Sequence, residues 1–145
     1  MTESSFDTAR VSEKYDYVAP DGSRIRHLLS VEEGNLVHCT LPPRTVSKAH
    51  RHRTVKELWY VLSGEGEVWR KHGDHQKIVD VSANVSLSIP AGTHFQFRTN
   101  GRKPLCILIV TMPPWPGSDE AVRVPGPWNP DVAERGNTRE KPVRE

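Results

Sequence analysis

Cysteine is scarce in this sequence: of its 145 residues, only Cys39 and Cys106 are cysteines. Both lie in apolar, strand-like runs, so we expect buried reduced thiols rather than a disulfide or a pair of metal ligands. Long apolar runs are missing as well. No stretch approaches the roughly 20 residues that span a bilayer, and the polar start lacks the charged-then-apolar order of a secretory signal. These absences predict a cytoplasmic protein that does not associate with membranes.

A block of like charges is also absent. The formal net charge of +2 comes from 20 basic and 18 acidic residues that are interspersed along the chain. Nucleic acid is therefore not expected as a partner, because its binding proteins concentrate basic residues on one face. Only 35% of the residues are hydrophobic and 12 are prolines. This composition predicts one domain with a modest core and extended termini.

No segment keeps a helical period of 3.6 residues, whereas strand patterns recur along the chain. Residues 23–43 read as two strands around the turn Glu33–Gly34–Asn35, in which we expect Gly34 and Asn35 to supply a positive φ. Residues 57–71 read as two strands around Gly64–Gly66. Residues 77–90 give another pair around Ala83–Asn84, and residues 94–114 a turn at Asn100–Gly101 before a continuous apolar run. Short strands separated by Gly, Asn and Pro predict an all-β, antiparallel sandwich or small barrel.

The stretch HRHRTVKE, which begins at His50, carries the clearest chemical signal. On an extended strand, side chains two residues apart point to the same face at a separation of roughly 7 Å, so His50 and His52 can chelate one ion. Glu57 follows after a link long enough for a neighbouring antiparallel strand to return beside them. Two imidazoles and a carboxylate suit Zn, Fe(II), Mn, Ni or Cu, and the residue types do not select among these metals. The competing interpretation is a solvated strand that merely alternates polar residues.

The surrounding pattern resembles that of the cupin superfamily. The first cupin motif places a glycine before HxH and another after the glutamate; here His50, His52, Glu57 and Gly64 match, and Arg44 stands at the leading glycine. The second motif is approximated by NVSLSIPAGTHFQFRTN, in which Asn84 replaces a glycine. Asn tolerates a left-handed turn better than other residues with a side chain, which makes that exchange mild.

The resemblance implies a cupin jelly-roll β-barrel over residues 21–116, preceded by an extension over 1–20 and followed over 117–145 by a proline-rich segment and a charged tail. It also implies one divalent transition metal per chain and a homodimer. The tryptophans Trp115 and Trp128 in the region after the barrel either pack on the outer sheet or belong to a segment that forms a lid across the barrel mouth or exchanges with a second subunit.

A fourth metal ligand is less clear. An ungapped match to the second motif puts Phe95 at the family's histidine, whereas a deletion of one residue in the turn puts His94 there. Strand alternation makes the two choices exclusive, because neighbouring side chains point to opposite faces. We favour His94 as the ligand, since a barrel that presents three donors gains from a fourth.

The resemblance implies a metal-binding cupin that acts on a small organic metabolite. A substrate pocket is expected to be lined by five residues, which are Trp59, Val61, Phe95, Gln96 and Phe97. Because cupins serve many functions, a non-catalytic small-molecule binder is the main alternative. A further alternative comes from the likeness of RHRTVKELWYVLSGEGEVWR and TMPPWPG to the cupin domain of hydrazine-forming synthetases, which join two amino acids through a nitrogen–nitrogen bond; that role requires a second protein.

Overall fold

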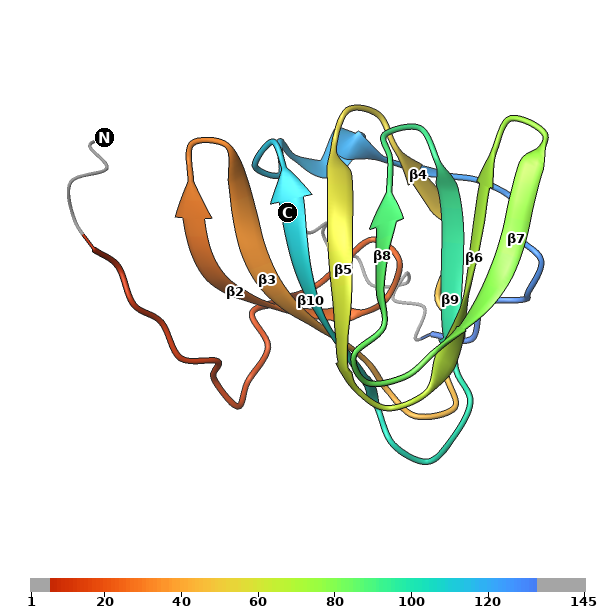
Figure 1. The fold of residues 1–145 in the computed structure, drawn as a ribbon, viewed down its shortest axis with the longest axis horizontal. Coiled ribbons are helices and arrows are strands. Elements are labelled where there is room, and N and C mark those ends of the chain that lie inside the picture. Colours follow the sequence, from red (N-terminus) through yellow and green to blue (C-terminus); the bar gives the residue numbers. More distant parts are fainter. Residues whose placement is uncertain (1–5, 133–145) are drawn as a thin grey trace.

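Two antiparallel β-sheets face each other in the computed structural model, which describes residues 6–132 (Figure 1). One sheet has the strand order β1-β2-β3-β10-β5-β8, and the other has the order β11-β4-β9-β6-β7. The elements are β1 (Tyr17–Val18), β2 (Arg24–Val31), β3 (Gly34–Leu41), β4 (His50–His52), β5 (Lys56–Ser63), β6 (Gly66–His72), β7 (His75–Val81), β8 (Ser86–Ile89), β9 (His94–Thr99), β10 (Leu105–Met112), the 3-10 turn η1 (Ser118–Glu120) and β11 (Ala121–Arg123).

Some turns carry the chain from one sheet to the other, and these crossings make the fold a jelly roll rather than two separate sheets of hairpins. The strands β5 and β6 lie in different sheets, as do β7 and β8, although each pair is adjacent in the sequence. Gly64 makes the first of these crossings at φ 89°, and an added Cβ there would meet the carbonyl oxygen of Pro104. Asn84 makes the second at φ 78°. The expectation that Asn84 takes a left-handed conformation in place of glycine is confirmed.

Gly34 acts differently from its expected role. We expected it to supply a positive φ in the β2–β3 turn, but it is not among the residues with positive φ. An added Cβ would instead meet the carbonyl oxygen of Thr111. Glycine at this position therefore allows β10 to approach β3 closely, and the turn itself lies one residue earlier, at Glu32–Glu33.

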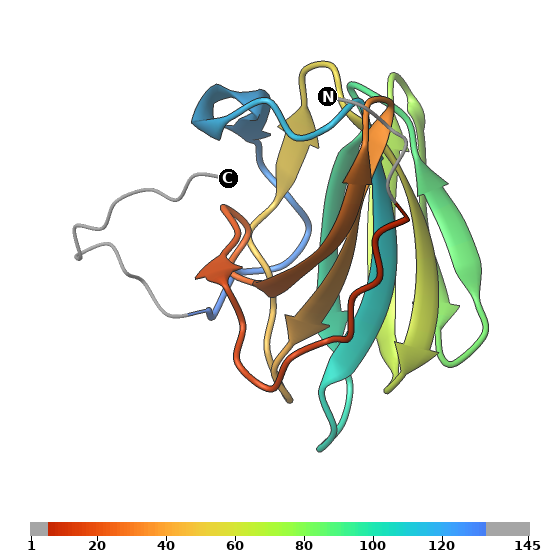
Figure 2. The ribbon, with the colours of Figure 1, turned by 90° about the vertical axis from the view of Figure 1, so that its left-hand side faces the viewer.

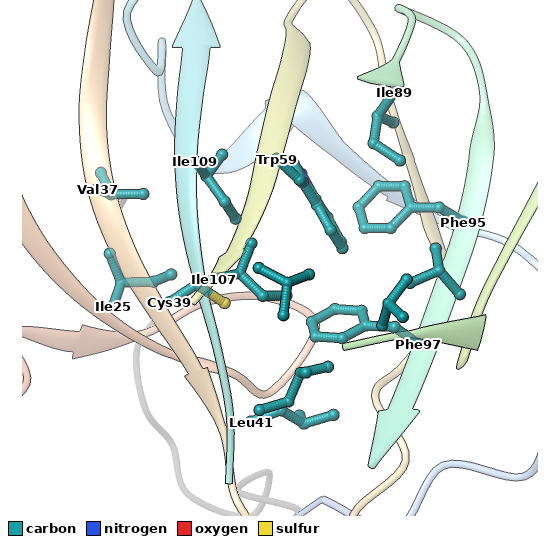
Figure 3. Close-up of a cluster of buried hydrophobic side chains, with 14 residues drawn as sticks. Ile25, Val37, Cys39, Leu41, Trp59, Ile89, Phe95, Phe97, Ile107 and Ile109 are labelled. Carbon is teal, nitrogen blue, oxygen red and sulfur yellow. The ribbon is translucent and has the colours of Figure 1, made fainter. Parts of the chain in front are cut away.

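Buried apolar side chains fill the space between the sheets (Figure 3). Strand alternation sorts them: along β5, Trp59 and Val61 are buried, while Leu58, Tyr60 and Leu62 are 41–53% exposed on the outer face. The rings of Phe95 and Phe97 each meet the Trp59 ring edge to face, with centroids 5.8 Å and 5.1 Å from that of Trp59. Both sheets thus contribute side chains to one apolar core.

The two short strands β1 and β11 lie outside the predicted range 21–116, and each extends a sheet at its edge. β11 lies beside β4, blue against gold in Figure 2. In the register of this pair, Arg123 lies opposite His50. The predicted charged tail from residue 133 onward lies outside the described residues. Within the described part of the chain, no helix has the length and apolar character needed to cross a membrane.

Candidate metal centre

His50, His52 and Glu57 line one cavity inside the barrel. The two histidines lie at the ends of β4, with Arg51 between them on the opposite face, and each histidine is only 6% exposed. Glu57 comes from β5 in the other sheet and is 7% exposed. The cavity has a volume of about 70 Å³. Since one water needs roughly 10–15 Å³ by the same kind of measure, the space accommodates a ligand of only a few heavy atoms.

Burial keeps both imidazoles neutral. Loss of hydration lowers the pKa of His50 to about 3, and the cations of Arg123 and Lys48 add to this effect. Loss of hydration also lowers the pKa of His52 to about 4, opposed by the carboxylate of Glu120. A neutral imidazole has a free nitrogen lone pair, which is the form that ligates metals. Both histidines therefore have the protonation state of metal ligands at neutral pH.

The carboxyl group of Glu57 has a higher pKa than an exposed glutamate. Burial raises its pKa to about 8, although Trp59 Nε1 donates a hydrogen bond to Glu57 Oε1 at 2.8 Å and lowers it. Glu57 Oε2 lies 3.7 Å from His52 Nδ1. Because this histidine is neutral, the contact is not an ion pair. A cation placed here would favour the ionised carboxylate.

The three residues suit a metal in donor type and placement. The Nδ1 atoms of His50 and His52 are buried and have no hydrogen-bond partner. Two imidazoles and a carboxylate form a common donor set for divalent transition metals. Among residues 6–132, however, no three His, Cys, Asp or Glu side chains already converge at metal-binding distances. The three side chains therefore have suitable donor atoms and share one cavity, but they do not form a preformed metal-binding cluster.

Residues 37–111 match the Cupin domain family, which is more than half of the chain. This chain belongs to the cupin family. An uncharacterized protein from Methanocaldococcus jannaschii is 30% identical over 111 residues, which cover 73% of this cupin and 86% of that protein.

Solved structures resemble this cupin in fold. A predicted oxalate decarboxylase from Thermotoga maritima has a TM-score of 0.62 and 23% identity, over 73% of this chain and 98% of that one. Oxalate decarboxylase from Bacillus subtilis has a TM-score of 0.68 and 15% identity, over 85% of this chain and 33% of that one, so this cupin spans about a third of that enzyme. At these identities the likeness concerns the fold alone.

His94 is not placed with the other three predicted ligands. In the register of β4 and β9, Phe95 lies opposite His50, and His94 lies opposite Arg51. Paired residues on antiparallel strands point to the same face, so His94 shares the outer face with Arg51. His94 does not line the cavity, whereas Phe95 does. The prediction that His94 points into the barrel beside His50 and His52 is therefore wrong, because β9 follows the ungapped register.

Of the five residues predicted to line the pocket, three line the cavity and two do not. Trp59, Phe95 and Phe97 line the cavity, and their assignment to its wall agrees with the structure. Val61 is fully buried but lies in the apolar core and not at the cavity. Gln96 points to the outer face because it alternates with Phe95 and Phe97 on β9. Placing Val61 and Gln96 in the pocket was wrong.

Gln96 instead fixes the segment that follows β11. Its Nε2 donates hydrogen bonds to the carbonyl oxygens of Ser47 at 2.8 Å and Trp128 at 2.9 Å, and its Oε1 accepts one from Trp128 N at 3.1 Å. The guanidinium of Arg98 lies over the Trp128 ring, 4.1 Å from its centroid. Trp128 thus packs on the outer sheet, as the first of the two interpretations predicted.

Trp115 does not share this position and lies at the cavity instead. Its ring meets that of His52 edge to face, with centroids 4.8 Å apart, and it lines the cavity. Sequence reasoning treated the two tryptophans alike because both lie among prolines. Their different positions follow from the path of the chain after β10.

The sequence analysis did not identify Glu120, which lies in the proline-rich segment after the barrel. Its Oε2 accepts hydrogen bonds from the backbone N–H groups of Thr54 and Val55, both at 2.6 Å, and its Oε1 accepts one from Thr54 Oγ1 at 3.0 Å. These two residues form the link between His52 and Glu57. Glu120 therefore holds the connection between two of the candidate ligands.

Proposed function

We propose that this cupin binds one divalent transition metal through His50, His52 and Glu57 and is an enzyme that acts on a small organic metabolite. The observation that carries the proposal is the placement of two neutral, buried imidazoles and a carboxyl group in one cavity. Three protein ligands leave coordination positions open, as in catalytic rather than structural metal sites. Zn, Fe(II), Mn, Ni and Cu all suit these donors.

A bound metal would supply Lewis-acid chemistry to a substrate oxygen or nitrogen. The protein's own contribution is to exclude water from the cavity and to limit the size of the metabolite that can enter. Trp59, Phe95 and Phe97 form an apolar wall, and Trp115 covers His52. A cavity of about 70 Å³ is well below the roughly 300–1,000 Å³ of sites for drug-sized ligands, so the metabolite contains only a few heavy atoms.

Proton release tests the role of Glu57. Since the pKa of this carboxyl is about 8 and both imidazoles are neutral above about pH 4, metal binding at pH 7 should release close to one proton, which comes from Glu57. Apparent affinity should therefore rise with pH up to about 8 and then level off. Exposed imidazoles would lose their affinity for metal below about pH 6, where they become protonated. Burial lowers the pKa of both histidines, so the carboxyl of Glu57 controls the pH dependence instead.

Isothermal titration calorimetry with Zn²⁺ or Mn²⁺, repeated in buffers of different ionisation enthalpy, measures this proton count. Glu57→Gln keeps the shape and one oxygen donor but has no proton to release. Unchanged proton release in the Glu57→Gln protein would show that another group titrates, and Glu57 would then not be a ligand.

The alternative is a cupin that binds a metabolite without converting it. Metabolite screening by thermal shift against the Zn, Fe(II), Mn, Ni and Cu forms can find a ligand. In an enzyme, Glu57→Gln should lower turnover of that ligand more than its affinity. Recovery of every stabilising ligand unchanged from all metal forms, with and without oxygen, supports the binding protein instead. The nitrogen–nitrogen bond-forming role stays a prediction.

The homodimer is likewise a proposal. Leu58, Tyr60 and Leu62 expose apolar surface on the outer face of β5, and Leu108 and Val110 of β10 lie opposite Tyr60 and Leu58 around a shallow groove. If two copies pair through this face, Leu58→Glu should convert the dimer to a monomer in light scattering at micromolar concentration, since a buried charge without a partner opposes association. A wild-type monomer under these conditions contradicts the proposal.

A further inference from the structure

Glu57, Thr111 and Asn35 form a row across three adjacent strands. Thr111 on β10 pairs with Glu57 on β5 at one side and with Asn35 on β3 at the other. Paired residues in antiparallel strands point to the same face, and all three side chains line the cavity that holds the histidines. The row therefore continues the candidate metal centre along the wall of the other sheet.

Two members of this row carry polar atoms that no other protein group satisfies. Within residues 6–132, Thr111 Oγ1 and Asn35 Oδ1 are buried without a hydrogen-bond partner, and Thr111 is only 5% exposed. Trp115 Nε1, at the same cavity, is a third buried atom without a partner. A buried polar group without a partner costs stability, so a chain that places three of them around one cavity indicates a ligand that completes their hydrogen bonds.

We propose that Thr111, Asn35 and Trp115 form a subsite for a hydroxyl group of a small ligand. The Trp115 N–H can only donate, Asn35 Oδ1 can only accept, and the Thr111 hydroxyl does either. A ligand hydroxyl both accepts and donates and so satisfies all three. A carboxylate only accepts, and an ammonium group only donates. The inference rests on the proposed function in one respect: the rest of the ligand faces the metal-binding residues.

Three two-carbon probes test this discrimination. Glycolate, acetate and glycine share a carboxylate and differ only in a hydroxyl, a hydrogen or an ammonium group at the second carbon, and all are small enough for the cavity. We expect glycolate to bind at least about tenfold more tightly than acetate or glycine, because a site built to hydrogen-bond a hydroxyl rejects analogues without one. Titration of ¹⁵N-labelled protein, both metal-free and loaded with Zn²⁺, gives the affinities. The Trp115 indole N–H resonance should shift with glycolate.

Thr111→Val removes the hydroxyl and keeps nearly the same shape. We expect the preference for glycolate over acetate to fall below about threefold, while the Tm rises by about 2–4 °C because an unsatisfied buried hydroxyl is lost. Thr93→Val is the matched control: Thr93 Oγ1 is also buried without a partner, but Thr93 does not line the cavity. That variant should gain stability and keep the full preference. Trp115→Phe keeps a ring against His52, removes the N–H, and should also weaken the preference.

Equal affinities for glycolate and acetate in both the metal-free and the Zn²⁺-loaded protein overturn the proposal, as does a glycolate preference that Thr111→Val leaves unchanged. The experiment can contradict the hydroxyl subsite without contradicting the metal site, and the reverse. Zinc binding without discrimination among the probes removes the hydroxyl subsite and leaves the metal site. A Thr111-dependent preference for glycolate in a protein that binds no metal supports the subsite and removes the metal site.

Discussion

His50→Ala and His52→Ala should each weaken metal binding by about 100- to 1,000-fold, or about 3–4 kcal/mol. Apparent free energies for zinc in small protein sites run to about 10–16 kcal/mol over four ligands, so one ligand accounts for roughly this share. Both histidines are buried beside the same cavity and are neutral. Elemental analysis of the purified protein and competition with a chelator measure stoichiometry and affinity, and circular dichroism checks that the variants remain folded.

His94→Ala is the matched control, because it removes an imidazole only one strand position away from the cavity. His94 lies opposite Arg51 on the outer face, so its loss should change affinity by less than about twofold. The sequence-based choice of His94 as fourth ligand predicts a large loss instead. Metal content that is unchanged in both His50→Ala and His52→Ala would contradict the proposed metal site.

Glu120→Ala should lower the free energy of unfolding by about 3 kcal/mol. Three hydrogen bonds to the carboxylate are lost, each worth about 1 kcal/mol net, and the buried N–H of Val55 is left without a partner. Since Thr54 and Val55 link His52 to Glu57, the same change should weaken metal binding by about tenfold. Urea unfolding of the metal-free protein separates the stability effect from the effect on affinity.

Two further variants calibrate this result. Glu120→Gln should cost only about 1 kcal/mol, because its amide oxygen can accept both N–H bonds while its amino group faces the Thr54 hydroxyl. Asp119→Ala, in the same turn but exposed, should stay within about 0.5 kcal/mol of the wild type. A loss as small for Glu120→Ala as for Asp119→Ala would show that the link is held by other contacts.

The stability that Glu120 contributes should depend on pH in a definite direction. Burial raises the pKa of Glu120, but hydrogen bonds from Thr54 and Val55 outweigh it, and the pKa lies below the ordinary glutamate value. A carboxyl with a lowered pKa in the folded state stabilises the fold above its unfolded pKa. That stabilisation is lost as the pH falls through the lower, folded value. The difference in stability between wild type and Glu120→Ala should therefore be constant at neutral pH and shrink in acid.

Much of this fold could be predicted from local sequence patterns. Alternation along a strand is a property of the chain itself, so HRH on a strand already places His50 and His52 on one face. Left-handed turns have a similarly local cause, and Gly64 and Asn84 mark two sheet crossings. The cupin motifs then ordered these elements into a jelly roll, and the family match over residues 37–111 confirms the assignment.

Only the tertiary structure decided which face of β9 is inward and which distant residues meet. His94 and Phe95 have the same local pattern in either register, and pairing with β4 selects Phe95 because the aromatic ring packs against Trp59 in the core. Glu120 reaches Thr54 across 66 positions of the sequence. Thr111 meets Asn35 and Glu57 only because β10 lies between β3 and β5. Such contacts depend on strand order, which no local pattern carries. The sequence by itself therefore determined most of the strands and the three candidate ligands His50, His52 and Glu57, and the tertiary structure determined which other residues join them.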